Sequence, residues 1–148
     1  MKNLKLLGLL LVLFFGSFAL VGCGGDDDDD NGGDAAQLVG SWLETRVEGW
    51  EMDSKLGKED LTENIPADEA ATLTLNANGT FTVTVPDKPS HSYSGTYVYN
   101  EARKEIRVSR NGRYEETYKV EKLTSSKLVI ITEDDDDAFI RTIYKRLK

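Results

Sequence analysis

A single cysteine and a single histidine are the residues of this chain whose types most often do nucleophilic or metal chemistry. Cys23 closes an apolar N-terminal segment, and His91 follows Pro89 and Ser90 at the entrance to a strand-like segment, where an exposed turn residue is expected. One histidine rules out a site built on two, and the sequence has no phosphate-binding glycine loop, dinucleotide fingerprint or zinc spacing. We therefore expect no enzyme, no metal and no cofactor.

Tyrosines carry a stronger signal, because they recur at alternate positions of two segments. The first holds Tyr93, Tyr97 and Tyr99, and the second Tyr114 and Tyr118. If this face points inward, its rings and hydroxyls suit an amphipathic ligand; the alternative is that the rings simply fill a narrow interior. Glu116 shares the face, and if buried it would need a partner such as Arg141.

Alternation with a period of two predicts strands for most of the chain after residue 38. Leu73 and Leu75 alternate with threonines, and Phe81 and Val83 repeat the pattern. Asn-Gly at 111–112 predicts a two-residue type I′ turn. The eight expected strands cover residues 39–47, 71–75, 81–85, 92–99, 105–109, 113–123, 127–132 and 138–147.

Short connections between these segments force antiparallel neighbours, so we predict an all-β fold: an eight-stranded antiparallel up-and-down barrel. A two-sheet β-sandwich is the alternative. Residues 49–69 are expected to form a long connection with a short helix near Asp60. Because long connections are often binding loops, this segment and Trp50 are candidate ligand contacts.

The N-terminus has the pattern of an export signal: Lys2 and Lys5 precede an apolar run through Leu20 that is short for a membrane span. The run ends in Leu-Val-Gly-Cys at 20–23, which resembles the lipobox of bacterial lipoprotein signals. The resemblance implies cleavage after residue 22 and acylation of Cys23, which would anchor the protein to a membrane.

Residues 24–34 contain no apolar side chain and five consecutive aspartates. Such a stretch cannot bury surface, so we expect a solvated tether from Cys23 through residue 37. The acidic run also resembles the signal that sends lipoproteins of Bacteroidetes-type bacteria to the outer face of the outer membrane. We expect residues 38–148 to form one domain.

The charge balance argues against a nucleic-acid partner. The full chain has 18 basic and 26 acidic residues and a net charge of −8. Loss of Lys2 and Lys5 with the signal makes the balance still more acidic, whereas a nucleic-acid-binding domain needs a basic face.

The start of the first strand, Gly40-Ser41-Trp42, resembles the Gly-x-Trp motif of lipocalins and related calycin barrels. The strand order and the C-terminal Tyr144-Lys145-Arg146 are similar to those of small lipocalin-like domains in Bacteroidetes lipoproteins. The resemblance implies that Trp42 plugs the closed end of the barrel and that an arginine of the last strand, Arg141 or Arg146, packs across it.

Two functions follow as hypotheses. The first is a membrane-anchored cell-surface lipoprotein whose barrel binds a small apolar or amphipathic ligand. Its expected contacts are Tyr93, Tyr97, Tyr99, Tyr114, Tyr118 and Trp50. The second is a non-enzymatic accessory protein of the cell envelope that has a filled barrel and uses its outer surface to bind other proteins.

Overall fold

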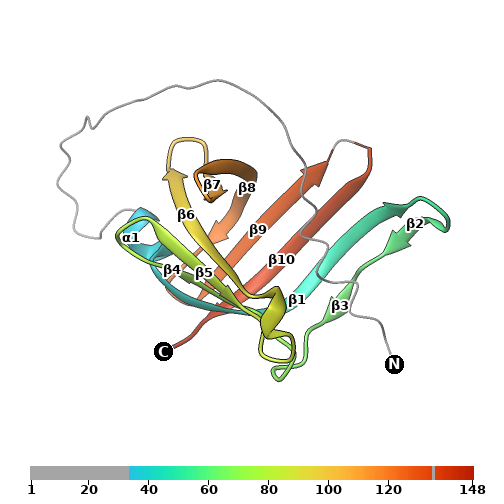
Figure 1. Cartoon of the computed structure of the whole chain (residues 1–148), viewed down its shortest axis with the longest axis horizontal. Helices are drawn as coiled ribbons and strands as arrows, with labels where there is room; N and C mark the ends of the chain where they lie inside the picture. Colours follow the sequence, from blue (N-terminus) through green and yellow to red (C-terminus); the bar gives the residue numbers. More distant parts are fainter. Residues whose placement is uncertain (1–33, 135) are drawn as a thin grey trace.

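The computed structural model describes residues 34–134 and 136–148, and it shows a single curved β-sheet closed on itself (Figure 1). Signal cleavage, Cys23 and the aspartate run at 26–30 lie outside the described residues. The described part contains no helix with the length and apolar character needed to cross a membrane. Its strands are β1 (Gly40–Asp53), β2 (Gly57–Asp60), β3 (Glu63–Asn64), β4 (Thr72–Leu75), β5 (Thr80–Thr84), β6 (Tyr93–Asn100), β7 (Glu105–Arg110), β8 (Arg113–Leu123), β9 (Lys127–Asp134) and β10 (Ala138–Arg146).

Eight of these strands form the barrel, and the predicted fold class is confirmed. β4 to β10 pair in sequence order, β4 pairs with β1, and β1 pairs with β10 to close the sheet. All of these pairings are antiparallel. The closing seam is long, with partners from Trp42 and Arg146 to Glu51 and Ala138. Because one sheet closes on itself, the sandwich alternative is wrong.

The expectation of a long connection with a helix near Asp60 is wrong. β1 continues to Asp53, and the chain returns along it as β2 and β3. The reason is the length of β1: β4 covers it only up to Leu43, so the rest of that edge would otherwise leave backbone groups unpaired. The Asp60 carboxylate accepts a hydrogen bond from the Thr62 amide, which forms a tight turn and does not start a helix.

Turn residues in the other connections behave as their types predict. Asn111 and Gly112 both have positive φ, 52° and 73°, as a type I′ hairpin requires. Gly79 has φ 81° in the turn between β4 and β5. Between β5 and β6 a short 3₁₀-helix, η2 (Pro89–His91), carries the exposed His91.

One end of the barrel is closed by the short helix α1 (Asp34–Leu38) and a packed core. Residues 34–37, which we assigned to the tether, form this helix. Leu38 and Trp42 are fully buried there, and the Trp42 Nε1 donates a hydrogen bond to the Leu38 carbonyl over 2.9 Å. Lys104 forms an ion pair with Asp34, which fixes α1 to the turn between β6 and β7. In Figure 1, α1 lies at the opposite end of the barrel from the hairpin of β1 and β2.

Candidate functional site

The barrel encloses a cavity of about 1070 Å³ that opens at the end opposite α1. Its walls come from alternate residues of the strands, as the pleat of a sheet requires. On β10, for example, Ile140, Thr142 and Tyr144 face the cavity. Small-ligand sites range from roughly 300 to 1,000 Å³, so the interior is not filled by its side chains. The expected alternative of a filled barrel is therefore wrong.

Apolar side chains form most of the wall at middle depth. They come from the three barrel strands β4, β5 and β7 and from the segment between β2 and β4: Leu73, Leu75, Phe81, Val83, Ile106, Val108, Leu61 and Ile65. Phe81 packs edge-to-face on Tyr93, with ring centroids 5.9 Å apart. Such a wall provides a surface for the apolar part of a ligand.

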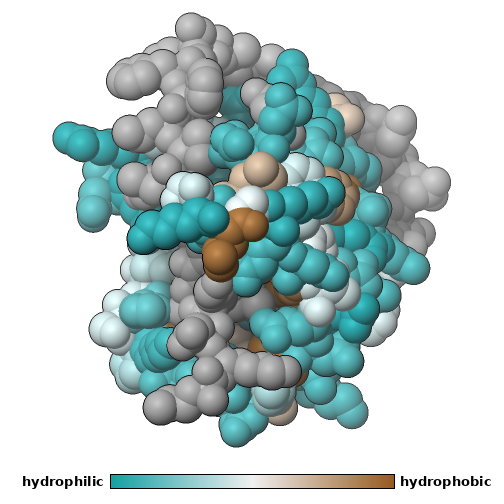
Figure 2. Space-filling model, turned by 90° about the vertical axis from the view of Figure 1, so that its right-hand side faces the viewer, coloured by the Kyte–Doolittle hydropathy of each residue, from teal (hydrophilic) through white to brown (hydrophobic). Residues whose placement is uncertain are grey.

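The mouth of the cavity is more polar. It is formed by the β1–β2 hairpin, by residues before β4 and by the β9–β10 turn, with Met52, Asp53, Ser54, Glu69, Asp134 and Asp137 among the lining residues. Figure 2 shows the side of the molecule that carries this hairpin, a largely hydrophilic face with a few apolar side chains near its middle. Met52 is 49% exposed at this rim.

The predicted tyrosines divide into two groups by depth. Tyr93, Tyr114 and Tyr118 line the cavity. Tyr97 and Tyr99 lie on the same face of β6 but do not line it, because β6 runs from the mouth to the closed end and these two rings pack on the core there. The Tyr97 hydroxyl donates to the Asn76 carbonyl over 2.8 Å. The Tyr99 hydroxyl is buried and makes no hydrogen bond within the described residues. Burial raises the pKa of both phenols.

β-bulges change which side chains of β8 and β1 face the interior, and they affect Tyr114 and Trp50 differently. Val108 pairs with Glu116, but its neighbour Ser109 pairs with Tyr114, so β8 has one extra residue between its two tyrosines. Tyr114 therefore lies at the rim, 44% exposed, and its hydroxyl is 2.5 Å from that of Thr117.

A similar register shift follows Glu44 in β1. It changes which residues face inward, so Val47 and Glu51 line the cavity and Trp50 does not. The Trp50 ring instead lies 4.2 Å from the Lys58 Nζ of β2. Trp50 thus packs against Lys58 within the β1–β2 hairpin and does not line the cavity.

Sequence reasoning found only part of a polar centre within the cavity, because it placed Tyr93, Glu116 and Tyr118 on one face and missed Glu44 and Tyr144. We use this name for Glu44, Tyr93, Glu116, Tyr118 and Tyr144, which lie on β1, β6, β8 and β10 and influence one another electrostatically. The Tyr118 hydroxyl donates to Glu116 Oε2 over 2.6 Å. Burial, and secondarily the Glu116 charge, raises the Tyr118 pKa well above its usual value.

Burial strongly perturbs the Glu44 carboxyl group of this centre. Desolvation raises its pKa to about 7, with a further increase from the Glu63 charge, while a hydrogen bond with the Ala71 backbone opposes the change. Its cross-strand partner is Tyr144, whose pKa is raised well above the usual value by burial and then by the Glu44 charge. Both residues could have been identified from the sequence, because alternate residues of a strand share one face. Glu44 lies two positions after Trp42, and Tyr144 lies two positions before Arg146.

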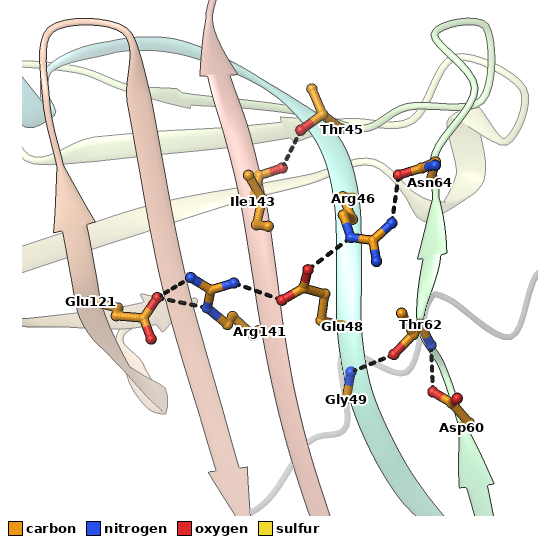
Figure 3. Close-up of polar contacts among 10 residues, drawn as sticks. All are labelled: Thr45, Arg46, Glu48, Gly49, Asp60, Thr62, Asn64, Glu121, Arg141 and Ile143. Carbon is orange, nitrogen blue, oxygen red and sulfur yellow. Dashed lines mark hydrogen bonds and ion pairs between the residues drawn. The ribbon is translucent and has the colours of Figure 1, made fainter.

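Arg141 does not reach Glu116 or Trp42, contrary to expectation. It lies on the outer surface, since its neighbours Ile140 and Thr142 face inward. Its guanidinium binds Glu48 over 2.6 Å and Glu121 over 2.5 Å (Figure 3). Arg46 extends this outer network from Glu48 to Asn64 of β3.

Arg146 is the arginine that packs across Trp42, with its Cζ 4.2 Å from the ring centroid. The guanidinium also donates to the carbonyls of Ser125 over 2.6 Å, Val39 over 2.9 Å and Gln37. Gly40 makes room for it: a Cβ at that position would lie 2.3 Å from Arg146 Nη1. Gly40, Trp42 and Arg146 thus form one unit at the closed end.

No group of three or more His, Cys, Asp or Glu side chains in the described part of the chain is arranged to hold a metal ion.

A closed antiparallel meander of eight strands with a cavity open at one end defines a class of small barrels that bind ligands in their interior. Residues 38–130 match the lipocalin-like domain family, and the chain belongs to that family. The resemblance based on Gly40-Ser41-Trp42 is confirmed.

Among solved structures, the chain is similar to a lipocalin-like protein from Bacteroides uniformis. The two share 16% identity with a TM-score of 0.44, over 75% of this chain and 99% of the other. No curated protein matches the sequence significantly.

Proposed function

We propose that this protein binds a small amphipathic molecule inside its barrel while a lipid on Cys23 holds it at the outer face of a bacterial outer membrane. The observation that carries the binding function is the open cavity of about 1070 Å³ with apolar walls and a few convergent polar groups. The lipocalin-like family of the chain points the same way.

The anchor rests on the sequence. Leu-Val-Gly-Cys at 20–23 supports acylation of Cys23, and the aspartates at 26–30 support a solvated spacer and an export address. The barrel would then be presented to the medium with its ligand-binding mouth accessible.

Binding is tested with N-phenyl-1-naphthylamine, a neutral apolar probe whose fluorescence rises in an apolar environment. Wild type should bind it, and Val83→Trp, which fills the cavity wall, should reduce the affinity about tenfold or more. Val98→Trp is the matched control, because Val98 is 68% exposed and does not line the cavity. Equal binding by both variants, with both melting cooperatively, would exclude the cavity as the site.

The anchor is tested by metabolic labelling with a radioactive fatty acid in a bacterium that processes lipoproteins. Wild type should carry label and Cys23→Ser should not. Protease treatment of intact cells then reports surface exposure, since an outward-facing barrel is accessible. Label on the Cys23→Ser variant, or full protection of wild type from protease, would contradict the anchor or the surface location respectively.

A further inference from the structure

The charges that line the cavity have one sign. Among its described lining residues nine are Asp or Glu and none is Lys, Arg or His. They extend from the rim, where Asp53 and Asp134 lie, past Glu51 and Glu63 to Glu44 and Glu116 within the barrel. Confined between low-dielectric walls, charges of one sign add to a field that attracts the opposite charge.

Basic residues lie around the cavity but do not line it. Lys119 binds Glu133 over 2.7 Å at the exposed rim. The Arg110 guanidinium lies 4.5 Å from the Tyr93 ring centroid and does not line the cavity. The cations of the outer wall, Arg46 and Arg141, are bound to Glu48 and Glu121. None of these places a positive charge beside Glu44.

We propose that the cavity selects a cationic amphiphile, an amine on an apolar body, whose ammonium group lies between Glu44 and Glu116 against the tyrosine rings of the polar centre. This inference rests on the proposed function, because it names the class of ligand that the same cavity takes. Carboxylates and ring faces are the two groups that proteins use together to hold an ammonium ion.

The apolar body of the ligand has its own surface. Phe81, Val83, Ile106 and Ile130 lie around the polar centre and offer no hydrogen-bond donor. An anionic amphiphile such as a fatty acid would place its carboxylate in the same acidic field without a basic partner, which disfavours it.

The protonation of Glu44 fits this role. Its pKa of about 7 reflects burial and the neighbouring Glu63 charge. The other ionisable groups that influence it or lie in the polar centre are Tyr144 on β10, Tyr118 and Glu116 on β8 and Tyr93 on β6. A bound cation would favour the carboxylate, lower the Glu44 pKa and release a proton.

Three probes with the same ten-carbon tail test the inference: decylammonium, decanol and decyl sulfate, each below its micelle concentration, titrated calorimetrically into the purified protein at pH 8. Decylammonium should bind at least about tenfold more tightly than decyl sulfate, with decanol between them. Equal or tighter binding of decanol or decyl sulfate would overturn the charge preference and leave the proposed function standing. Absence of binding by all three would overturn both.

Variants locate the charge recognition. Glu44→Gln and Glu116→Gln should each weaken decylammonium binding about five- to tenfold and change decanol binding by a much smaller factor. Decanol binding reports that each variant is folded, and if one variant fails to fold the other decides. Glu101→Gln is the control: it removes one negative charge at the closed end and keeps an oxygen that can accept the hydrogen bond from the Ala35 amide. Loss of decylammonium binding in this control alone would overturn the proposal.

The pH dependence gives a separate readout. Decylammonium keeps its charge from pH 5.5 to 8, while Glu44 loses its proton over this range. Affinity should therefore rise with pH in wild type and become flatter in Glu44→Gln. A pH profile that is identical in the two proteins would contradict the placement of the ammonium group at Glu44.

Discussion

Arg146 lies over Trp42, with its Cζ 4.2 Å from the ring centroid, and the two residues are also cross-strand partners in the pairing of β1 with β10. The guanidinium also donates hydrogen bonds to the carbonyls of Gln37, in the last turn of α1, and Val39, directly after the helix. A positive charge at a helix C-terminus compensates the partial negative charge of those carbonyls. One side chain thereby joins the first strand, the last strand and the helix that closes the barrel.

Replacing Arg146 should therefore destabilise the whole barrel. Arg146→Ala removes charge-assisted hydrogen bonds to several carbonyls and should lower the free energy of unfolding by about 2–4 kcal/mol. Arg146→Lys keeps the charge but loses the planar fork, so a loss of about 1–2 kcal/mol is expected. Urea denaturation followed by tryptophan fluorescence measures both. Equal stability of Arg146→Ala and wild type would show that the contact has no energetic role.

Arg141 provides the contrasting case on the outer surface. Its partners Glu48 and Glu121 are about one-third exposed, and solvent-exposed pairs contribute roughly 0.2–1 kcal/mol each. Arg141→Ala should thus cost about 1 kcal/mol or less at low salt, and the difference should shrink in 1 M NaCl because salt screens the pairs. A loss as large as that of Arg146→Ala, unchanged by salt, would be inconsistent with this assignment.

Among the glycines of the described residues, Gly49 is the one at which a side chain has least room. Its φ is +135°, and a Cβ there would lie 1.9 Å from the Phe139 carbonyl oxygen on β10. Gly49→Ala should force β1 away from β10 and cost about 2–4 kcal/mol. Gly57→Ala is the matched control, since Gly57 also has positive φ, +77°, but nothing lies within 4 Å of its Cβ position.

The control should lose only about 1 kcal/mol, which is the conformational cost of the left-handed region for alanine. Thermal melts of the two variants under identical conditions make the comparison. Equal melting temperatures would contradict the close approach between Gly49 and Phe139.

Glu44 should make stability depend on pH. Its pKa is about 7 in the folded protein against 4.5 without the fold, so the folded state binds more protons between these values. The stabilisation relative to an ionised carboxylate is complete below pH 4.5 and is lost as the pH rises through 7. With allowance for solvent in the cavity, the loss is about 1–3 kcal/mol.

The measurement is the difference in unfolding free energy between Glu44→Gln and wild type from pH 4 to 9. It should grow in favour of the variant across the neutral range, because glutamine has no charge to desolvate. Glu101→Gln, at the closed end of the barrel, is the control for the loss of one negative charge. A constant difference at all pH values would refute the raised pKa.

Local patterns determine most of the strands, which is why they could be predicted. Phe81 and Val83 alternate with threonines, and Asn111-Gly112 specifies its turn from two adjacent residues. β2 and β3 could not be found in this way. Their residues are mostly polar, and they become strands only because β1 extends beyond Leu43 and offers an unpaired edge.

The site was predictable only in part for a related reason. Alternation placed Tyr93 and Tyr118 on the inner face, but the bulges after Glu44 and between Tyr114 and Glu116 depend on pairing with distant strands. The depth of Tyr97 and Tyr99 depends on the tilt of β6. The open volume is the space that the inward-facing side chains leave within a barrel of this radius. It depends on all eight strands together, so no single segment of the sequence determines it.

The seam between β1 and β10 has a kinetic consequence. From β4 to β10, each strand pairs with the strand next to it in the sequence. The seam instead pairs Trp42 with Arg146, which come from opposite ends of the domain. Closing so long a loop is entropically slow, so the meander can form first and the seam last. Until the seam closes, β1 and β10 each expose an unpaired edge, and the rate of closure sets how long the nascent protein is vulnerable to aggregation.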